Sequence, residues 1–304
     1  MDNLNKIGHW VSVDGENSYK KYYQLAMKLL PEPVNIHDIV TSFGIVRVYE
    51  WSTDVTQERT PVLLLPGRSS GTPMWFKNLP DLLKERTVYS VDMLGDCGMS
   101  TQKAVLQNSD DQAEWLHQIL DYLRLNKVHI VGHSFGGWAA ANYASRYNQK
   151  IATMALLEPV FTFQWVRLSL LIKISFAMLP FWPKKWVEDT LLTIGGTRKE
   201  DIDPNDVMYR MIAEGKKHFK ANLPQPVRIS IEQIKSWNMP VYVAFGQNST
   251  LHNSYKAYEI ARSNINDLSG QVWPETTHSL PMEIPSLINA ELLQFWNIQE
   301  SVLR

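Results

Sequence analysis

The sequence contains a single cysteine, Cys97, so no disulfide bond can form within the chain. It also lacks an excess of charge of either sign. The formal net charge of −1 gives no electrostatic basis for binding nucleic acid or an acidic membrane surface. The first ten residues contain no apolar signal core, so we expect a cytoplasmic protein rather than a secreted one.

Long hydrophobic runs are absent as well. The strongest candidate, residues 161–182, is interrupted by Arg167, Lys173 and Pro180, and it lacks the uninterrupted run of about 18 apolar residues that a spanning helix needs. We therefore expect no membrane span and interpret this segment as an amphipathic helix that covers a groove. The eight histidines show no metal-ligand spacing, so we expect neither a metal nor another cofactor.

Strand patterns and helical patterns alternate along most of the chain. The predicted strands lie at residues 36–40, 44–51, 61–65, 87–93, 128–131, 151–157, 241–245 and 270–274, and the predicted helices at 18–30, 75–84, 109–125, 138–147, 255–262 and 285–296. Such alternation predicts an α/β fold with a doubly wound, mostly parallel β-sheet.

The alternation stops between residues 160 and 237, where helical patterns occur without a convincing buried strand. We predict a helical cap there, inserted between two late strands. The core then consists of residues 1–159 and 238–304, and the cap of residues 160–237. With 304 residues, of which 44% are hydrophobic, the chain is long enough for one large domain with such an insertion.

The most informative motif is the sequence GHSFGG at residues 132–137. It follows an apolar strand-like run and opens a helical run. A serine with glycine two residues before and two residues after it, at a strand-to-helix turn, is typical of the nucleophile elbow of serine hydrolases. The glycines leave room where strand and helix nearly touch, and the helix start offers free N–H groups to an anion. Ser134 is the candidate nucleophile; the alternative is an ordinary solvated serine in a glycine-rich turn.

Four segments together resemble the α/β-hydrolase fold, in its serine esterase and lipase branch. They are PVLLLPG at 61–67, VDMLG at 91–95, GHSFGG at 132–137 and THSLPMEIP at 277–285. Within this family the chain is most similar to bacterial carboxylesterases that hydrolyse aryl-propionate esters such as naproxen esters. The resemblance implies that the loop after the last strand carries the base, which is His278. His252, after the penultimate strand, is the rival candidate.

The resemblance also implies an oxyanion hole made of two backbone N–H groups. By position these belong to Phe135, directly after the nucleophile, and to Arg68, in the loop after strand 61–65. The family usually has His-Gly at the start of that loop, whereas this chain has Pro66 and Gly67. We expect the side chain of Arg68 to be solvated or paired with an acid; the alternative is contact with a substrate carboxylate.

The catalytic acid is where the chain departs most from the family. The family usually places this carboxylate in the turn after strand 241–245, but the turn here reads GQNS at 246–249 and contains none. Some branches carry the acid at the end of the preceding strand, where this chain has Glu158. We therefore predict Glu158 as the acid. The alternatives are that Glu158 is solvated or caps a helix, and that neutral Ser249 holds the imidazole.

Together these residues predict a serine carboxylic-ester hydrolase that acts through an acyl-enzyme. In the aromatic-rich cap, Phe161, Trp165 and Trp182 are predicted to contact a small to medium apolar or aromatic substrate. The expected partner is thus a small-molecule ester, while the oligomeric state stays open, with a homodimer as one option. The alternatives are a non-hydrolytic ligand receptor or regulatory protein, and another acyl-transfer enzyme such as a thioesterase, a lactonase or a carbon–carbon bond hydrolase.

Overall fold

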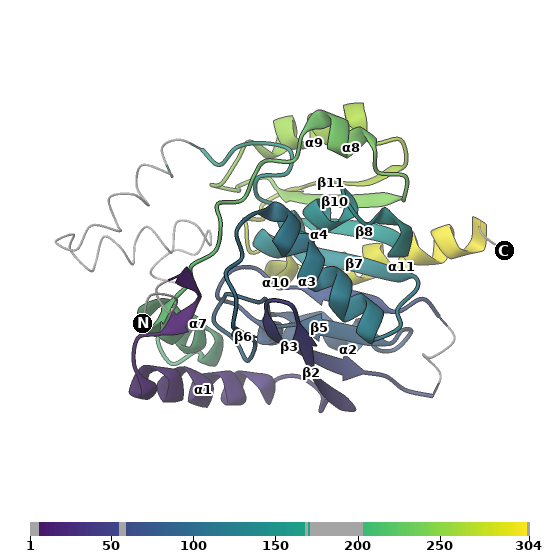
Figure 1. The fold of residues 1–304 in the computed structure, drawn as a ribbon. Helices are drawn as coiled ribbons and strands as arrows, with labels where there is room; N and C mark the ends of the chain where they lie inside the picture. The colour runs from purple at the N-terminus through teal and green to yellow at the C-terminus, as the bar shows by residue number, and fades with distance from the viewer. Residues whose placement is uncertain (1–5, 55–58, 168–169, 171–202, 303–304) are drawn as a thin grey trace.

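The structure is a computed structural model that describes residues 6–54, 59–167, 170 and 203–302. Its main feature is a nine-stranded sheet with the order β11-β10-β8-β7-β4-β5-β3-β2, in which β6 also pairs with β3 (Figure 1). The strands are β2 Asn35–Thr41, β3 Gly44–Trp51, β4 Val62–Leu65, β5 Val88–Val91, β6 Thr101–Gln102, β7 Val128–His133, β8 Ile151–Leu157, β10 Val241–Gly246 and β11 Leu268–Trp273.

Most of this sheet is parallel. All pairs from β5 through β4, β7, β8 and β10 to β11 are parallel, whereas β2, β3 and β6 pair antiparallel at one side of the sheet. The predicted doubly wound, mostly parallel α/β sheet is confirmed. Because parallel strands end at the same edge, the loops after β4, β7, β8, β10 and β11 gather there, where ligand sites of such sheets lie.

Helices cover both faces of the sheet, so the parallel strands are continuous apolar runs. Leu63 and Leu65 of β4 belong to one buried cluster with residues of α3, α4 and α9, whereas Val62 and Leu64 belong to a second cluster with residues of α1, α2 and α11 on the other face. The helices are α1 Val13–Met27, the 3₁₀ helix η2 Thr72–Lys77, α2 Leu79–Leu82, α3 Ser109–Tyr122, α4 Phe135–Ala144, the 3₁₀ helix η3 Asn148–Lys150, α9 Ser254–Asn264, α10 Leu280–Glu283 and α11 Pro285–Val302.

The prediction of one continuous helix at residues 75–84 is wrong. This stretch instead contains the end of η2 and the one-turn helix α2. Pro80 has no N–H to donate to the preceding turn, so a continuous α-helical ladder through this position is not possible. None of the helices in the described part of the chain is long and apolar enough to cross a membrane.

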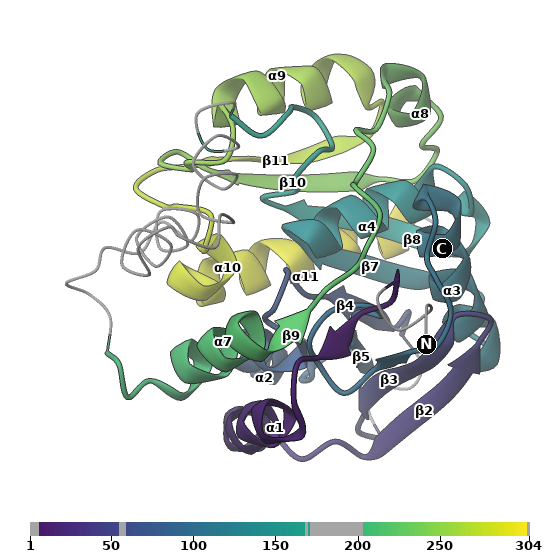
Figure 2. The same cartoon turned by 60° about the vertical axis from the view of Figure 1, so that its left-hand side comes forward.

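The described part of the insertion between β8 and β10 contains α7 Val207–His218, β9 Phe219–Lys220 and α8 Ile231–Lys235. Helix α7 lies beside α1, and β9 pairs antiparallel with β1 His9–Trp10 (Figure 2). Besides this two-residue strand, residues 161–167 and 221–230 form turns and loops, which departs from the helical pattern expected there. Most of the amphipathic helix predicted at 161–182 lies outside the described residues. Residues 171–202 lie outside the described residues, so the division into core and cap stays a prediction.

Candidate active site

Ser134 occupies a sharp turn between β7 and α4. Its backbone has φ 55° and ψ −115°, a conformation that is costly for a residue with a side chain. Two glycines make the turn possible. A Cβ atom on Gly136 would lie 2.1 Å from the carbonyl oxygen of Leu65, and one on Gly132 would lie 2.3 Å from that of Gly136. The sequence GHSFGG therefore forms the strand–turn–helix arrangement that its glycine spacing predicts.

His278 meets this serine from the loop between β11 and α10. Its Nε2 atom lies 2.8 Å from the Oγ atom of Ser134. A second contact holds the loop, because Nε2 of His133 donates to the carbonyl oxygen of His278 over 2.8 Å. This role of His133 could not be predicted from the sequence, because the contact depends on the direction of a side chain beside the elbow.

Glu158 reaches the other side of the same imidazole from the end of β8. Its side chain is fully buried, and its Oε2 atom lies 3.0 Å from Nδ1 of His278. The Oγ atom of Ser249 donates to Oε2 over 2.7 Å, and the N–H of Gly246 donates to Oε1 over 2.6 Å. Ser249 thus contacts the carboxylate, not the imidazole. Glu158 is neither solvated nor a helix cap, the two alternatives considered for it.

The loop after β4 passes directly over the serine. A Cβ atom on Gly67 would lie 3.3 Å from the Cβ of Ser134. Arg68 follows in this loop, and Phe135 is the first residue of α4. Among the described residues, neither amide has a hydrogen-bond acceptor. Both are thus available to an anion, and their role as oxyanion donors stays a prediction.

Comparisons with known proteins agree with this geometry. A sequence profile described as "alpha/beta hydrolase fold" matches residues 60–192. The chain is 24% identical to the uncharacterized carboxylesterase nap of Bacillus subtilis over 94% of each chain, and 21% identical to carboxylesterase YbfK of the same organism over 94% of this chain and 96% of the relative. The naproxen esterase structure from Bacillus subtilis superimposes with a TM-score of 0.83 at 23% identity, covering 94% of this chain and 99% of that one.

The chain has the α/β-hydrolase fold. The family resemblance expected from the four sequence segments is confirmed. In this hydrolase fold, β7 carries the elbow, and the ends of β8, β10 and β11 supply Glu158, Ser249 and His278. Residues that are distant in sequence, Ser134 and Glu158, therefore meet on the two sides of the His278 imidazole, and Ser249 binds the carboxylate.

Burial controls the protonation of this hydrolase site. Desolvation lowers the pKa of His278 below its ordinary value of 6.5, so the resting imidazole is neutral and able to accept a proton. Desolvation raises the pKa of Glu158, and the hydrogen bonds from Ser249 and Gly246 oppose that rise. His252 stands beside the carboxylate, its Nε2 3.8 Å from Oε1 of Glu158. His252, the rival candidate for the base, therefore lies next to Glu158, whereas His278 contacts Ser134.

Asp96 supports the loop that carries the Arg68 amide. This buried carboxylate accepts the N–H of Ser69 over 2.7 Å, and Ser69 has a left-handed φ of 61°. The guanidinium of Arg68 lies near Asp96, with Nε 3.8 Å from Oδ2, and over the Phe135 ring at 5.2 Å from its centroid. Through these contacts Asp96 organises the loop after β4.

The predicted substrate-contacting aromatic residues are only partly described. Phe161 is half-buried and packs against the core cluster, with Trp165 at its edge at a centroid distance of 6.2 Å. Trp165 is 59% exposed, and the guanidinium of Arg228 lies 5.8 Å from the centroid of its ring. Trp182 lies outside the described residues. Contact of these three residues with a substrate stays a prediction.

Proposed function

We propose that this protein is a serine carboxylic-ester hydrolase that acts through an acyl-enzyme. The observation that carries the proposal is the continuous hydrogen-bond chain from Ser134 Oγ through His278 to Glu158. A serine hydroxyl needs a base to become a nucleophile, and that base needs an orienting acid. Relatives named carboxylesterases support hydrolysis of esters in general.

In the first half of the reaction, the Oγ of Ser134 bonds to the ester carbonyl carbon while its proton moves to Nε2 of His278. The developing oxyanion accepts hydrogen bonds from the amides of Arg68 and Phe135. His278 then gives the proton to the alcohol oxygen, the bond from the carbonyl carbon to that oxygen breaks, and the acyl group stays on Ser134. Glu158 stabilises the transient imidazolium.

In the second half, a water molecule takes the place of the serine as nucleophile. His278 accepts one proton from the water as its oxygen bonds to the acyl carbon, and returns it to Oγ as the acyl–serine bond breaks. The carboxylic acid leaves and the serine is regenerated. We propose a small to medium apolar or aromatic ester as substrate, and Phe161, Trp165 and Trp182 of the cap as its contacts.

A fluorophosphonate probe tests the proposal because it labels serines that a base has activated. We expect covalent labelling of the wild-type protein and none of Ser134→Ala, measured by intact-mass spectrometry. A panel of p-nitrophenyl esters of graded acyl size then defines the acyl preference. A wild-type protein that neither takes up the probe nor hydrolyses any of these esters would favour the non-hydrolytic receptor instead.

A further inference from the structure

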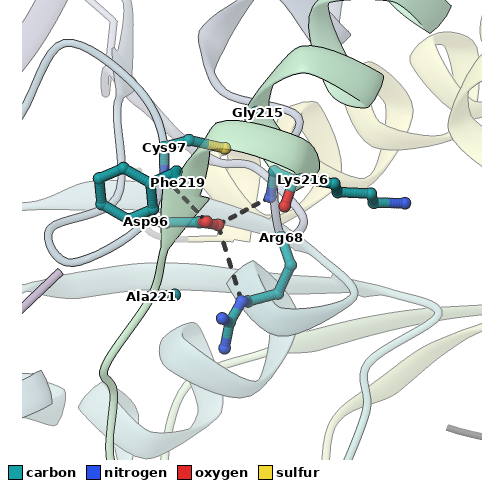
Figure 3. A pocket seen from close by; sticks show the side chains of 8 residues that line it. Arg68, Asp96, Cys97, Gly215, Lys216, Phe219 and Ala221 are labelled. Atoms are coloured by element: carbon teal, nitrogen blue, oxygen red, sulfur yellow. Dashed lines mark hydrogen bonds and ion pairs between the residues drawn. The ribbon is translucent and has the colours of Figure 1, made fainter. Parts of the chain in front are cut away.

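A cavity of about 270 Å³ lies beside the loop that follows β4. It is an open cavity bordered by that loop, by the turn after β5 and by the end of α7 with β9 (Figure 3). Its lining consists of Arg68, Ser69, Asp96, Cys97, Gly215, Lys216, Phe219 and Ala221. The volume is close to the lower end of the roughly 300–1,000 Å³ typical of small-molecule sites.

Arg68 is a positioned cation with unused donors. Its guanidinium lies over the Phe135 ring, and its Nε approaches Asp96 only to 3.8 Å. The oxygens of Asp96 already accept the N–H groups of Ser69 and Cys97, over 2.7 and 2.9 Å. Within the described residues, the guanidinium of Arg68 makes no hydrogen bond, and the side chain is 42% exposed. A planar guanidinium held in this way is suited to a bidentate anion.

The cavity has a net positive lining. Lys216 on α7 supplies a second cation, although desolvation lowers the pKa of its amino group and the nearby Asp96 opposes that shift. It forms no ion pair with any residue that the structure describes. Asp96 is the one carboxylate of the lining, so Arg68 and Lys216 leave an excess of one positive charge. Burial raises the pKa of the Cys97 thiol well above its usual range, so this side chain adds no negative charge.

We propose that this cavity binds an anionic end of the substrate, and that the hydrolase acts on esters whose acyl chain ends in a carboxylate. This inference rests on the proposed function and specifies its substrate class. A Cβ atom on Gly67 would lie 3.3 Å from the Cβ of Ser134, and Arg68 is the next residue, so the loop that carries the guanidinium passes beside the nucleophile. Phe219 offers an apolar wall to the methylene groups between the two ends.

Two p-nitrophenyl esters of equal acyl length test the proposal. One is the hemiester of glutaric acid, which is anionic, and the other is the pentanoate, which is neutral. We expect the wild type to favour the hemiester in kcat/KM by about tenfold, the factor that one charge-assisted hydrogen bond typically supplies. We expect Arg68→Gln to remove most of this preference and Lys216→Gln to reduce it. A wild type that prefers the pentanoate, or has no preference, overturns the proposal.

Lys217→Gln is the matched control because this exposed lysine is the next residue on α7 and does not line the cavity. It should keep the wild-type preference, and an equal loss in Lys216→Gln and Lys217→Gln overturns the role of Lys216. Binding of monomethyl glutarate to Ser134→Ala, measured by calorimetry, separates this inference from the proposed function, because it needs no turnover. Binding that Arg68→Gln abolishes supports the anion site even if no ester is hydrolysed; absence of binding overturns it.

Discussion

Glu158 combines a strained backbone, a buried side chain and three hydrogen bonds to its carboxylate. It leaves β8 with a left-handed φ of 51°, its side chain is fully buried, and it accepts hydrogen bonds from Ser249, Gly246 and His278. A strained backbone at a buried charge is costly, and such costs concentrate at functional sites. The turn after β10, where the resemblance places the acid, here supplies the Ser249 hydroxyl that donates to Glu158.

The first prediction compares the contributions of Glu158 and Ser249 to kcat. We expect Glu158→Gln to lower kcat on a p-nitrophenyl ester by about 10³- to 10⁴-fold, because an amide cannot stabilise the imidazolium. We expect Ser249→Ala to lower it by about tenfold, since one hydrogen bond to the charged acid is lost. Steady-state kinetics on both variants measure the difference. A near-normal rate for Glu158→Gln would refute its role as the acid.

A second prediction follows from the contacts of Asp96. In Asp96→Ala the N–H of Ser69 loses its acceptor, so the neighbouring Arg68 amide is less well oriented toward an oxyanion. We expect kcat to fall by about 10- to 100-fold, less than the roughly 100- to 1,000-fold that loss of an oxyanion donor costs. Affinity for a trifluoromethyl ketone, which forms an oxyanion on serine, should fall in proportion. Unchanged inhibitor affinity would show that Asp96 does not act through the loop.

The elbow at Ser134 requires β4, β7 and α4 to approach one another closely. We predict that Gly136→Ala lowers the free energy of unfolding by about 3 kcal/mol or more, because its methyl group would overlap the carbonyl oxygen of Leu65. Ester turnover should be lost together with stability, as the helix that carries Phe135 moves away from the sheet. Urea denaturation and a p-nitrophenyl ester assay measure both effects. Wild-type values in both would contradict the close approach.

The elements themselves were largely predictable. The buried strands at 61–65, 128–131 and 151–157 contain continuous apolar runs, and the observed β4, β7 and β8 lie within two residues of them. The β1–β9 pair was not predictable, because two-residue strands have no periodicity and residues 9–10 meet 219–220 only through tertiary contact. The proximity of Ser134, His278 and Glu158 follows from strand order, whereas the contacts of His133, Ser249 and Asp96 depend on side-chain directions that a sequence does not specify.

An ion pair between buried Arg86 and partly buried Glu300 connects α11 to the segment just before β5. Arg86 has no exposed surface, and its guanidinium binds both carboxylate oxygens of Glu300, over 2.6 and 3.1 Å. The ring of Trp296 stacks with His129 and lies 5.3 Å from the Arg86 guanidinium carbon, measured from the ring centroid. Since α11 covers one face of the sheet, this contact joins two regions that are distant in sequence.

We predict that Glu300→Gln lowers the free energy of unfolding by about 3 kcal/mol, because Arg86 is left as an uncompensated buried charge. The matched control is Glu85→Gln, which removes the ion pair between Arg59 and Glu85, two residues that are both about two-fifths exposed. The control should cost less than about 1 kcal/mol. Thermal and urea denaturation of the two variants provide the comparison, and equal losses would refute a special role for the buried pair.

The same pair predicts a dependence of stability on pH. Although burial opposes it, hydrogen bonds from His129 and Arg86 hold the pKa of Glu300 well below its ordinary value of 4.5. The folded state thus binds this proton more weakly than the unfolded state, so the stabilisation is present above about pH 4.5 and is lost as the pH falls further. The difference in unfolding free energy between wild type and Glu300→Gln should shrink from pH 7 to pH 3. A constant difference would contradict this account.

The ion pair between Arg86 and Glu300 also affects how the chain folds during its synthesis. The two residues are 214 positions apart, so the sheet from β2 to β8 emerges from the ribosome long before its carboxylate partner does. Until then, Arg86 lacks its carboxylate partner, so burying its charge is costly. Completion of the core therefore waits for α11, and premature collapse around an unpaired guanidinium is disfavoured.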